Sequence, residues 1–72
     1  MKELIAFYNT EYDNLIKFLK TTESEEDIQD AVRHSITIIN GATCFAISMN
    51  LVQYKDIFKV FEEYYDKFLS LR

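Results

Sequence analysis

The chain has 72 residues and a formal net charge of −4, from 8 basic and 12 acidic side chains. A chain of this length is expected to form a single domain, residues 1–72, around one core. Its content of 49% apolar residues is too high for a disordered protein. The acidic balance disfavours nucleic acid as a partner, because binding to a phosphate backbone relies on clustered lysine and arginine.

Cysteine and histidine occur once each, as Cys44 and His34. A disulfide within the chain and a zinc site of the usual cysteine–histidine pattern are therefore excluded, and we expect no cofactor. An unpaired cysteine is typical of a reducing compartment, and the first residues lack the pattern of a secretion signal. These features predict a cytoplasmic protein. The many residues with AT-rich codons favour a low-GC bacterium or its phage as the source.

The first predicted helix covers residues 2–20. Its apolar side chains recur at helical spacing and occupy about half of the helical wheel. Phe7 and Phe18 lie at the edge of that apolar arc. Lys17 and Lys20 near the end favour the negative end of the helix dipole.

The second predicted helix covers residues 25–49 and follows the polar stretch "TTESEED". Ser24 and Asp27 have the spacing of a capping box, and Thr22 with Glu25 offers a competing frame. The carboxylates crowded here suit the positive end of a helix, which is a more ordinary role than a cation site. The apolar arc of this helix holds the following residues: Ile28, Ala31, Val32, Ile36, Ile38, Ile39, Ala42, Phe45, Ala46 and Met49.

The stretch from Ser35 to Tyr54 carries no charge and has the length of a membrane span. Its asparagine, glutamine, threonine and serine residues are costly in hydrocarbon, and its neighbours are amphipathic helices that need a partner. The central spine of a soluble bundle explains both facts, so we expect no membrane partner. Asn50 suits the left-handed position that ends a helix, with Leu51 able to fold back as a hydrophobic contact.

The third predicted helix covers residues 53–71 and is rich in aromatic residues, as is the first. The second helix has only Phe45, with isoleucine and alanine supplying most of the rest. Dense cores set large side chains against small ones, so the second helix should be clasped between the other two. With short connections, the sequence predicts an all-α, antiparallel up-down-up three-helix bundle.

Three half-circle apolar faces are more than one short bundle can bury, because only about a third of each wheel faces inward. The surplus predicts a homodimer or a contact with another protein. Phe7, Phe18, Phe58 and Tyr65 are the predicted contact residues. The alternative is that tyrosines at the edges of the apolar arcs are partly exposed with their hydroxyls in water, so that the extra width of the arcs requires no partner.

A second candidate surface is the small-residue strip on the outer side of the second helix: Thr37, Gly41, Cys44 and Ser48. Gly41 costs about 1 kcal/mol relative to alanine inside a helix. Close approach of another backbone would explain it. The alternatives are a tolerated glycine or a kink beside Asn40. Cys44 is expected to be a small structural residue rather than a reactive thiol.

The search for catalytic motifs is empty, and we expect no enzyme. Asp30 and His34 lie one turn apart, so a hydrolytic or metal-dependent site built on them is a weak alternative. A helix–turn–helix nucleic-acid regulator is another, but the third helix has balanced charges instead of a basic face. The leading hypothesis is a non-enzymatic interaction module that forms a homodimer and regulates or inhibits a larger protein, with no small-molecule substrate evident.

Overall fold

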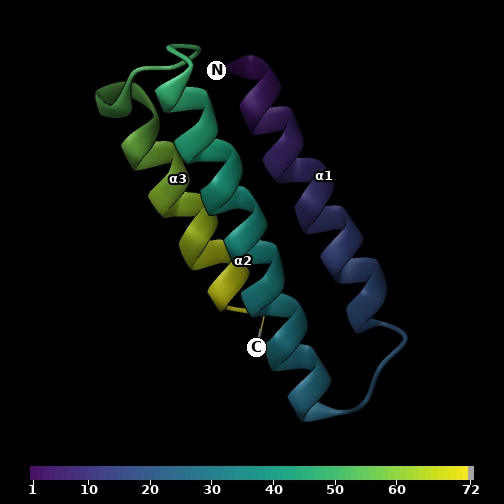
Figure 1. Cartoon of the computed structure of the whole chain (residues 1–72). Coiled ribbons are helices and arrows are strands. Elements are labelled where there is room, and N and C mark those ends of the chain that lie inside the picture. Colours follow the sequence, from purple (N-terminus) through teal and green to yellow (C-terminus); the bar gives the residue numbers. More distant parts are fainter. Residues whose placement is uncertain (72) are drawn as a thin grey trace.

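The computed structural model describes residues 1–71 as three helices, α1 (Lys2–Leu19), α2 (Glu25–Ser48) and α3 (Tyr54–Leu69). The helices alternate in direction, and α2 packs against both of the others (Figure 1). The predicted all-α, up-down arrangement is confirmed, and each helix boundary lies within two residues of the prediction. The bundle is elongated, with dimensions of 40 × 16 × 15 Å.

The start of α2 uses the first of the two predicted capping frames. The backbone N–H of Asp27 donates to Ser24 Oγ at 3.3 Å, and Ser24 has the extended backbone of an N-cap residue. This bond satisfies one of the free N–H groups at the helix start. The acidic first turn, Glu25 to Asp27, therefore lies at the positive end of the helix dipole, as expected.

The end of α2 is a Schellman turn centred on Asn50, whose φ of 59° is left-handed as predicted. Asn50 donates its N–H to the Ile47 carbonyl at 3.0 Å, and Leu51 donates to Ala46 at 2.9 Å. Leu51 was expected to fold back as the hydrophobic contact, but it stays 66% exposed. Its neighbour Val52 is buried in the core instead.

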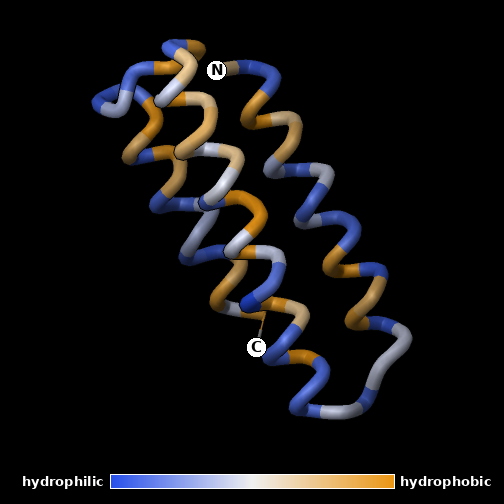
Figure 2. The backbone as a smooth tube through the Cα atoms, viewed as in Figure 1, coloured by the Kyte–Doolittle hydropathy of each residue, from blue (hydrophilic) through white to orange (hydrophobic). Residues whose placement is uncertain are grey.

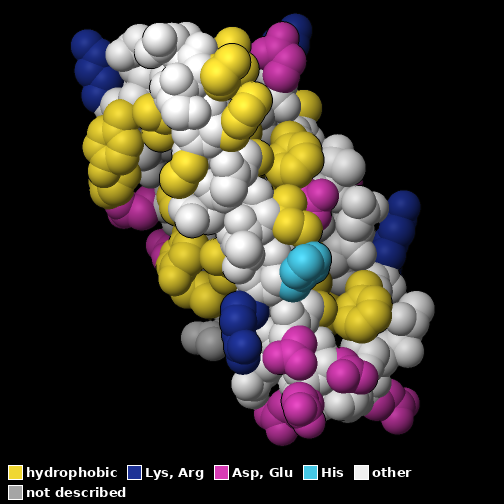
Figure 3. Space-filling model, viewed as in Figure 1, with side chains coloured by type: hydrophobic (Ala, Val, Ile, Leu, Met, Phe, Trp, Pro, Cys, Tyr) yellow, Lys and Arg dark blue, Asp and Glu magenta, His cyan; other side chains and the backbone are white. Residues whose placement is uncertain are grey.

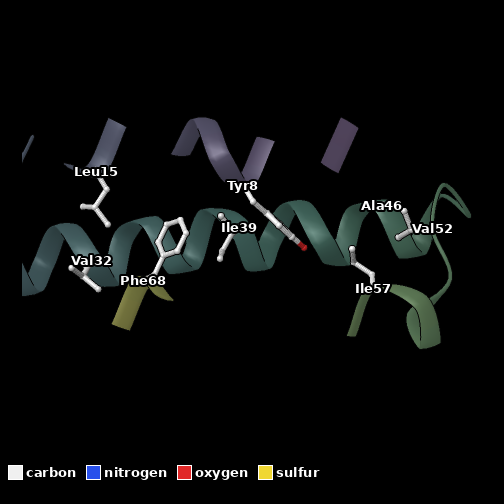
Figure 4. Packing of buried hydrophobic residues seen from close by; sticks show 8 residues of the cluster. All are labelled: Tyr8, Leu15, Val32, Ile39, Ala46, Val52, Ile57 and Phe68. Atoms are coloured by element: carbon white, nitrogen blue, oxygen red, sulfur yellow. The ribbon is translucent and has the colours of Figure 1, made fainter. Parts of the chain in front are cut away.

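The core is a line of eight buried apolar residues along the axis of the bundle (Figure 4). From α2 come Val32, Ile39 and Ala46, spaced seven residues apart, so they lie on one side of the helix. The other helices and the second turn supply the remaining five side chains, and the two aromatic ones among them come from α1 and α3, as predicted from the residue sizes. The five are Tyr8, Leu15, Val52, Ile57 and Phe68.

Aromatic side chains join α1 to α3. The rings of Tyr8 and Tyr64 lie 5.0 Å apart between centroids, and Tyr12 meets Phe68 edge-on at 5.4 Å. The Tyr64 hydroxyl donates to Asn9 Oδ1 at 2.7 Å. These contacts close the side of the bundle opposite α2, so α1 and α3 are held together mainly by their aromatic residues.

One buried polar group lies inside this core. Thr43 Oγ1 donates to the Ile39 carbonyl at 2.7 Å, and the Tyr8 hydroxyl hydrogen-bonds to Thr43 Oγ1. Since the threonine proton goes to the carbonyl, Tyr8 is the donor. Burial raises the pKa of Tyr8 above its ordinary value of 10.0, and the hydrogen bond to Thr43 offsets part of that rise.

Within residues 1–71, none of the helices combines the length and the apolar character that crossing a membrane requires.

Candidate interaction surface

The small-residue strip lies on the outer side of α2, where Thr37, Gly41, Cys44 and Ser48 are all exposed. A Cβ atom placed on Gly41 would meet nothing within 4 Å, so no neighbour in this chain requires a glycine there. The helix continues regularly through Gly41. The reason for the glycine is therefore not close packing within the chain.

The hydroxyl groups of the strip are bonded to their own helix. Thr37 Oγ1 donates to the Arg33 carbonyl at 3.0 Å, and Ser48 Oγ donates to the Phe45 carbonyl at 2.9 Å. Because these donors are already satisfied, covering the strip would cost little in lost hydrogen bonds to water.

The outer side of α2 changes character along its length. Its first half exposes charged residues, among them Asp27, Asp30 and Arg33. Figure 2 shows hydrophilic blue in the first turns of α2, whereas the second half of α2 is mostly pale or orange. No charge is exposed in that second half, which we call the uncharged face: Thr37, Asn40, Gly41, Cys44, Phe45 and Ser48.

The four aromatic residues predicted as contacts do not form one surface. Phe7 and Phe18 line grooves between α1 and α2 and are 37% and 45% exposed. Phe58 and Tyr65 line grooves between α2 and α3 and are 45% and 38% exposed. The outer side of α2 lies between these two pairs of aromatic residues. Figure 3 shows hydrophobic side chains on both sides of α2.

Sequence reasoning missed the most exposed apolar side chains, which are Phe45 (60%), Met49 (57%), Leu51 (66%) and Tyr54 (61%). Phe45 and Met49 belong to the apolar arc of the second helix, which is wider than the part that the bundle buries, and neither was among the predicted contact residues. Both lie about 80° or more from Ile39 on a wheel of 100° per residue, at the edge of the apolar arc. The positions of both residues on the wheel therefore indicated that they could be exposed, although their hydrophobicity favoured burial.

Asp30 and His34 are both exposed and line the groove between α1 and α2. Asp30 Oδ1 lies 3.6 Å from an Arg33 guanidinium nitrogen, so its ion pair is with Arg33. Cys44 is an exposed free thiol and lines a different groove, beside Phe58. In the part of the chain that the structure describes, no three His, Cys, Asp or Glu side chains are grouped so as to hold a metal ion.

The outer side of α3 is charged and mixed in sign. Acidic residues and lysines are interspersed along it, and all of them are exposed: Lys55, Asp56, Lys59, Glu62, Glu63, Asp66 and Lys67. This pattern differs from the uncharged face of α2, although both helices contribute to the same core.

Two surfaces thus stand out from an ordinary charged exterior: the uncharged face of α2, and the groove lined by Asp30 and His34. Comparison of the chain with protein-family models, curated proteins and solved structures finds no match. The function is therefore inferred from the physical character of these two surfaces.

Proposed function

We propose that this chain is a non-enzymatic protein interaction module that pairs with a second copy through its uncharged face and regulates or inhibits a larger protein. The observation that carries the proposal is an exposed helix side without charge, bordered by exposed aromatic residues. A helix side that faces only water usually carries charged residues, as the first half of α2 does.

The total exposed area supports a covered surface. The chain exposes 5132 Å². A compact monomer of 8.6 kDa is expected to expose about 4,700 Å² from the scaling of surface with mass. Large apolar side chains are exposed at the edges of the uncharged face, among them Phe45, Tyr54 and Phe58. Exposed apolar patches of this kind mark interaction sites.

A second copy is the occupant that we favour, because the surface can complement itself. A twofold dimer brings the same patch of both copies together, so the patch must contain both projections and hollows. Here the small-residue strip forms a low surface, and Phe45 and Phe58 project on its two sides. An aromatic residue of one copy can therefore pack over the strip of the other.

The charges favour an antiparallel crossing of the two α2 helices near Gly41. Asp30 lies eleven residues before Gly41, which corresponds to about 16 Å along a helix. In an antiparallel pair, the acidic starts of the two helices point away from each other. A parallel pair would place like charges side by side, which is unfavourable.

The test compares Gly41→Leu with Ala6→Leu, a matched control on the exposed side of α1. Leucine at position 41 meets open space in the isolated chain, so helicity by circular dichroism should be kept. Sedimentation equilibrium should show a dimer for the unmodified chain and for Ala6→Leu, but a monomer for Gly41→Leu. Equal association of all three would overturn pairing through this face.

A further inference from the structure

The groove between the second half of α1 and the first half of α2 has a volume of about 430 Å³ and is lined only by these two helices. Leu15, Phe18 and Ala31 give it an apolar floor. Glu11 on one side and Asp27 with Asp30 on the other place carboxylates along both rims. We call it the acidic groove; Figure 3 shows carboxylates gathered at this end of the molecule.

We propose that the acidic groove binds an amphipathic helix of another protein, with apolar residues on one side and lysine or arginine beside them. This inference rests on the proposed role as an interaction module and names the kind of partner. Helices dock in such grooves through apolar anchors spaced at i, i+3 or i+4, and i+7. Opposite charges on the rim select the partner and speed its association.

The length of the groove fits this occupant. Its lining runs from Glu11 to Phe18 on α1 and from Asp27 to Ser35 on α2. Seven or eight helical residues correspond to about 10–12 Å, which is the distance spanned by anchors at i and i+7. Two turns of a partner helix would therefore lie along the floor, between Glu11 on the α1 rim and Asp27 with Asp30 on the α2 rim.

The charge near the groove is acidic beyond its own rims. Glu23, Glu25 and Glu26 lie just before its α2 side. The nearby cations are Lys17 and Lys20 at the end of α1, together with Arg33, whose ion pair with Asp30 is exposed on both sides. An exposed pair of this kind contributes little and is readily exchanged for a better one.

A second copy of this chain fits the groove less well than a basic helix does. The exposed aromatic residue Phe58 of α3 has Lys55 and Lys59 near it in the sequence. Asp56 and Glu62 lie on the same helix and would meet the acidic rims. A partner with cations alone beside its apolar residues avoids that repulsion.

The experiment uses a labelled 14-residue helical peptide with leucine at positions i, i+3, i+4 and i+7 and lysine beside them, and a counterpart with glutamate for lysine. Fluorescence anisotropy should show saturable binding of the lysine peptide that weakens with salt. The glutamate peptide should bind at least about tenfold more weakly, because it meets like charges. Equal affinities, or no saturable binding of the lysine peptide at millimolar concentration, would overturn the proposal.

Two variants locate the binding. Neutralising the rims with Glu11→Gln, Asp27→Asn and Asp30→Asn should weaken the lysine peptide about tenfold. The matched control neutralises three exposed carboxylates of α3, Glu62, Glu63 and Asp66, and should change the affinity less than about twofold. Equal weakening by both would show nonspecific attraction and would contradict the groove as the site. Thermal unfolding of each variant checks that the fold is kept.

The peptide result is separable from self-pairing. The Gly41→Leu chain should bind the lysine peptide as the unmodified chain does, since Gly41 does not line the groove. If the unmodified chain is monomeric and still binds the peptide, the proposed dimer is wrong and the groove remains as the binding site. If the peptide instead splits a dimer, the groove is occupied by the second copy and the hetero-partner is wrong.

Discussion

The two halves of α2 have similar inner sides and very different outer sides. Val32 in the first half and Ile39 with Ala46 in the second half all lie in the same core. Outside, the first half exposes Asp30 and Arg33, whereas the second exposes no charge between Thr37 and Ser48. Because the core requirements are shared, they explain the inner sides and leave the outer difference unexplained.

This difference indicates that contact with water alone does not explain the absence of charge on the outer side of the second half of α2. Charged residues on the outer side of a solvated helix increase solubility and form local ion pairs. The first half of α2 has such charges, and Asp30 and Arg33 form an ion pair there. Leaving those charges out becomes favourable where a surface is covered, because burying unpaired charge is costly. The following predictions test the shared inner side first and then the outer side.

The largest effect is expected on the inner side. Ile39 is fully buried, so Ile39→Ala should lower the free energy of unfolding by about 2–5 kcal/mol. Phe45→Ala removes a larger side chain that is 60% exposed, and should cost less than about 1 kcal/mol in the dilute monomer. Urea unfolding followed by circular dichroism measures both. Similar losses would mean that Phe45 is packed within the chain.

The buried hydrogen bond between Tyr8 and Thr43 should give the next largest effect. Thr43→Val leaves the Tyr8 hydroxyl buried without its partner, at a cost of about 1–3 kcal/mol. Tyr8→Phe should cost about 1 kcal/mol, because Thr43 keeps its bond to the Ile39 carbonyl. In a double-mutant cycle the two losses should be less than additive. Strict additivity would show that the hydroxyls do not interact.

On the outer side, Gly41→Ala should raise the stability of the monomer by about 1 kcal/mol. The added methyl group meets nothing within 4 Å, and the helix is regular at this position. Thermal unfolding at low protein concentration measures the gain. A loss of stability would point to strain at Gly41 and would favour the kink considered from the sequence.

The titration of Tyr8 should have the smallest effect on stability, because it changes the free energy of unfolding only in alkaline solution. Its pKa in the folded chain is raised above 10.0, so its contribution to stability is complete below pH 10. That contribution is lost as the pH rises through the folded pKa. Tyr8→Phe should therefore show a shallower loss of stability above pH 10 than the unmodified chain. Parallel pH profiles would contradict this role.

The features that could be predicted from the sequence depend on residues close together along the chain. Ser24 caps α2 through Asp27, three residues away, and the left-handed backbone of Asn50 depends on its own small side chain. The helices follow from apolar spacing over a few turns. Local pattern thus accounts for the fold class and for the outward position of the small-residue strip.

The features that could not be predicted depend on contacts between distant residues. Thr43 is buried, and its hydroxyl bonds to Tyr8, which is 35 residues away in the sequence. Phe45 is exposed because α1 and α3 leave that edge of α2 uncovered, although its side chain is among the most apolar on the helix. The acidic groove likewise depends on the packing of α1 against α2, which brings Glu11 and Asp27 to the lining of one groove.

The pairing of two uncharged faces is tested most directly by the reactivity of Cys44. Its thiol is exposed within that face and is the only one in the chain. We expect the rate of labelling by a thiol reagent to fall as the protein concentration rises, in step with the mass measured by sedimentation. A rate that stays constant while the mass doubles would place the contact elsewhere and contradict pairing through this face.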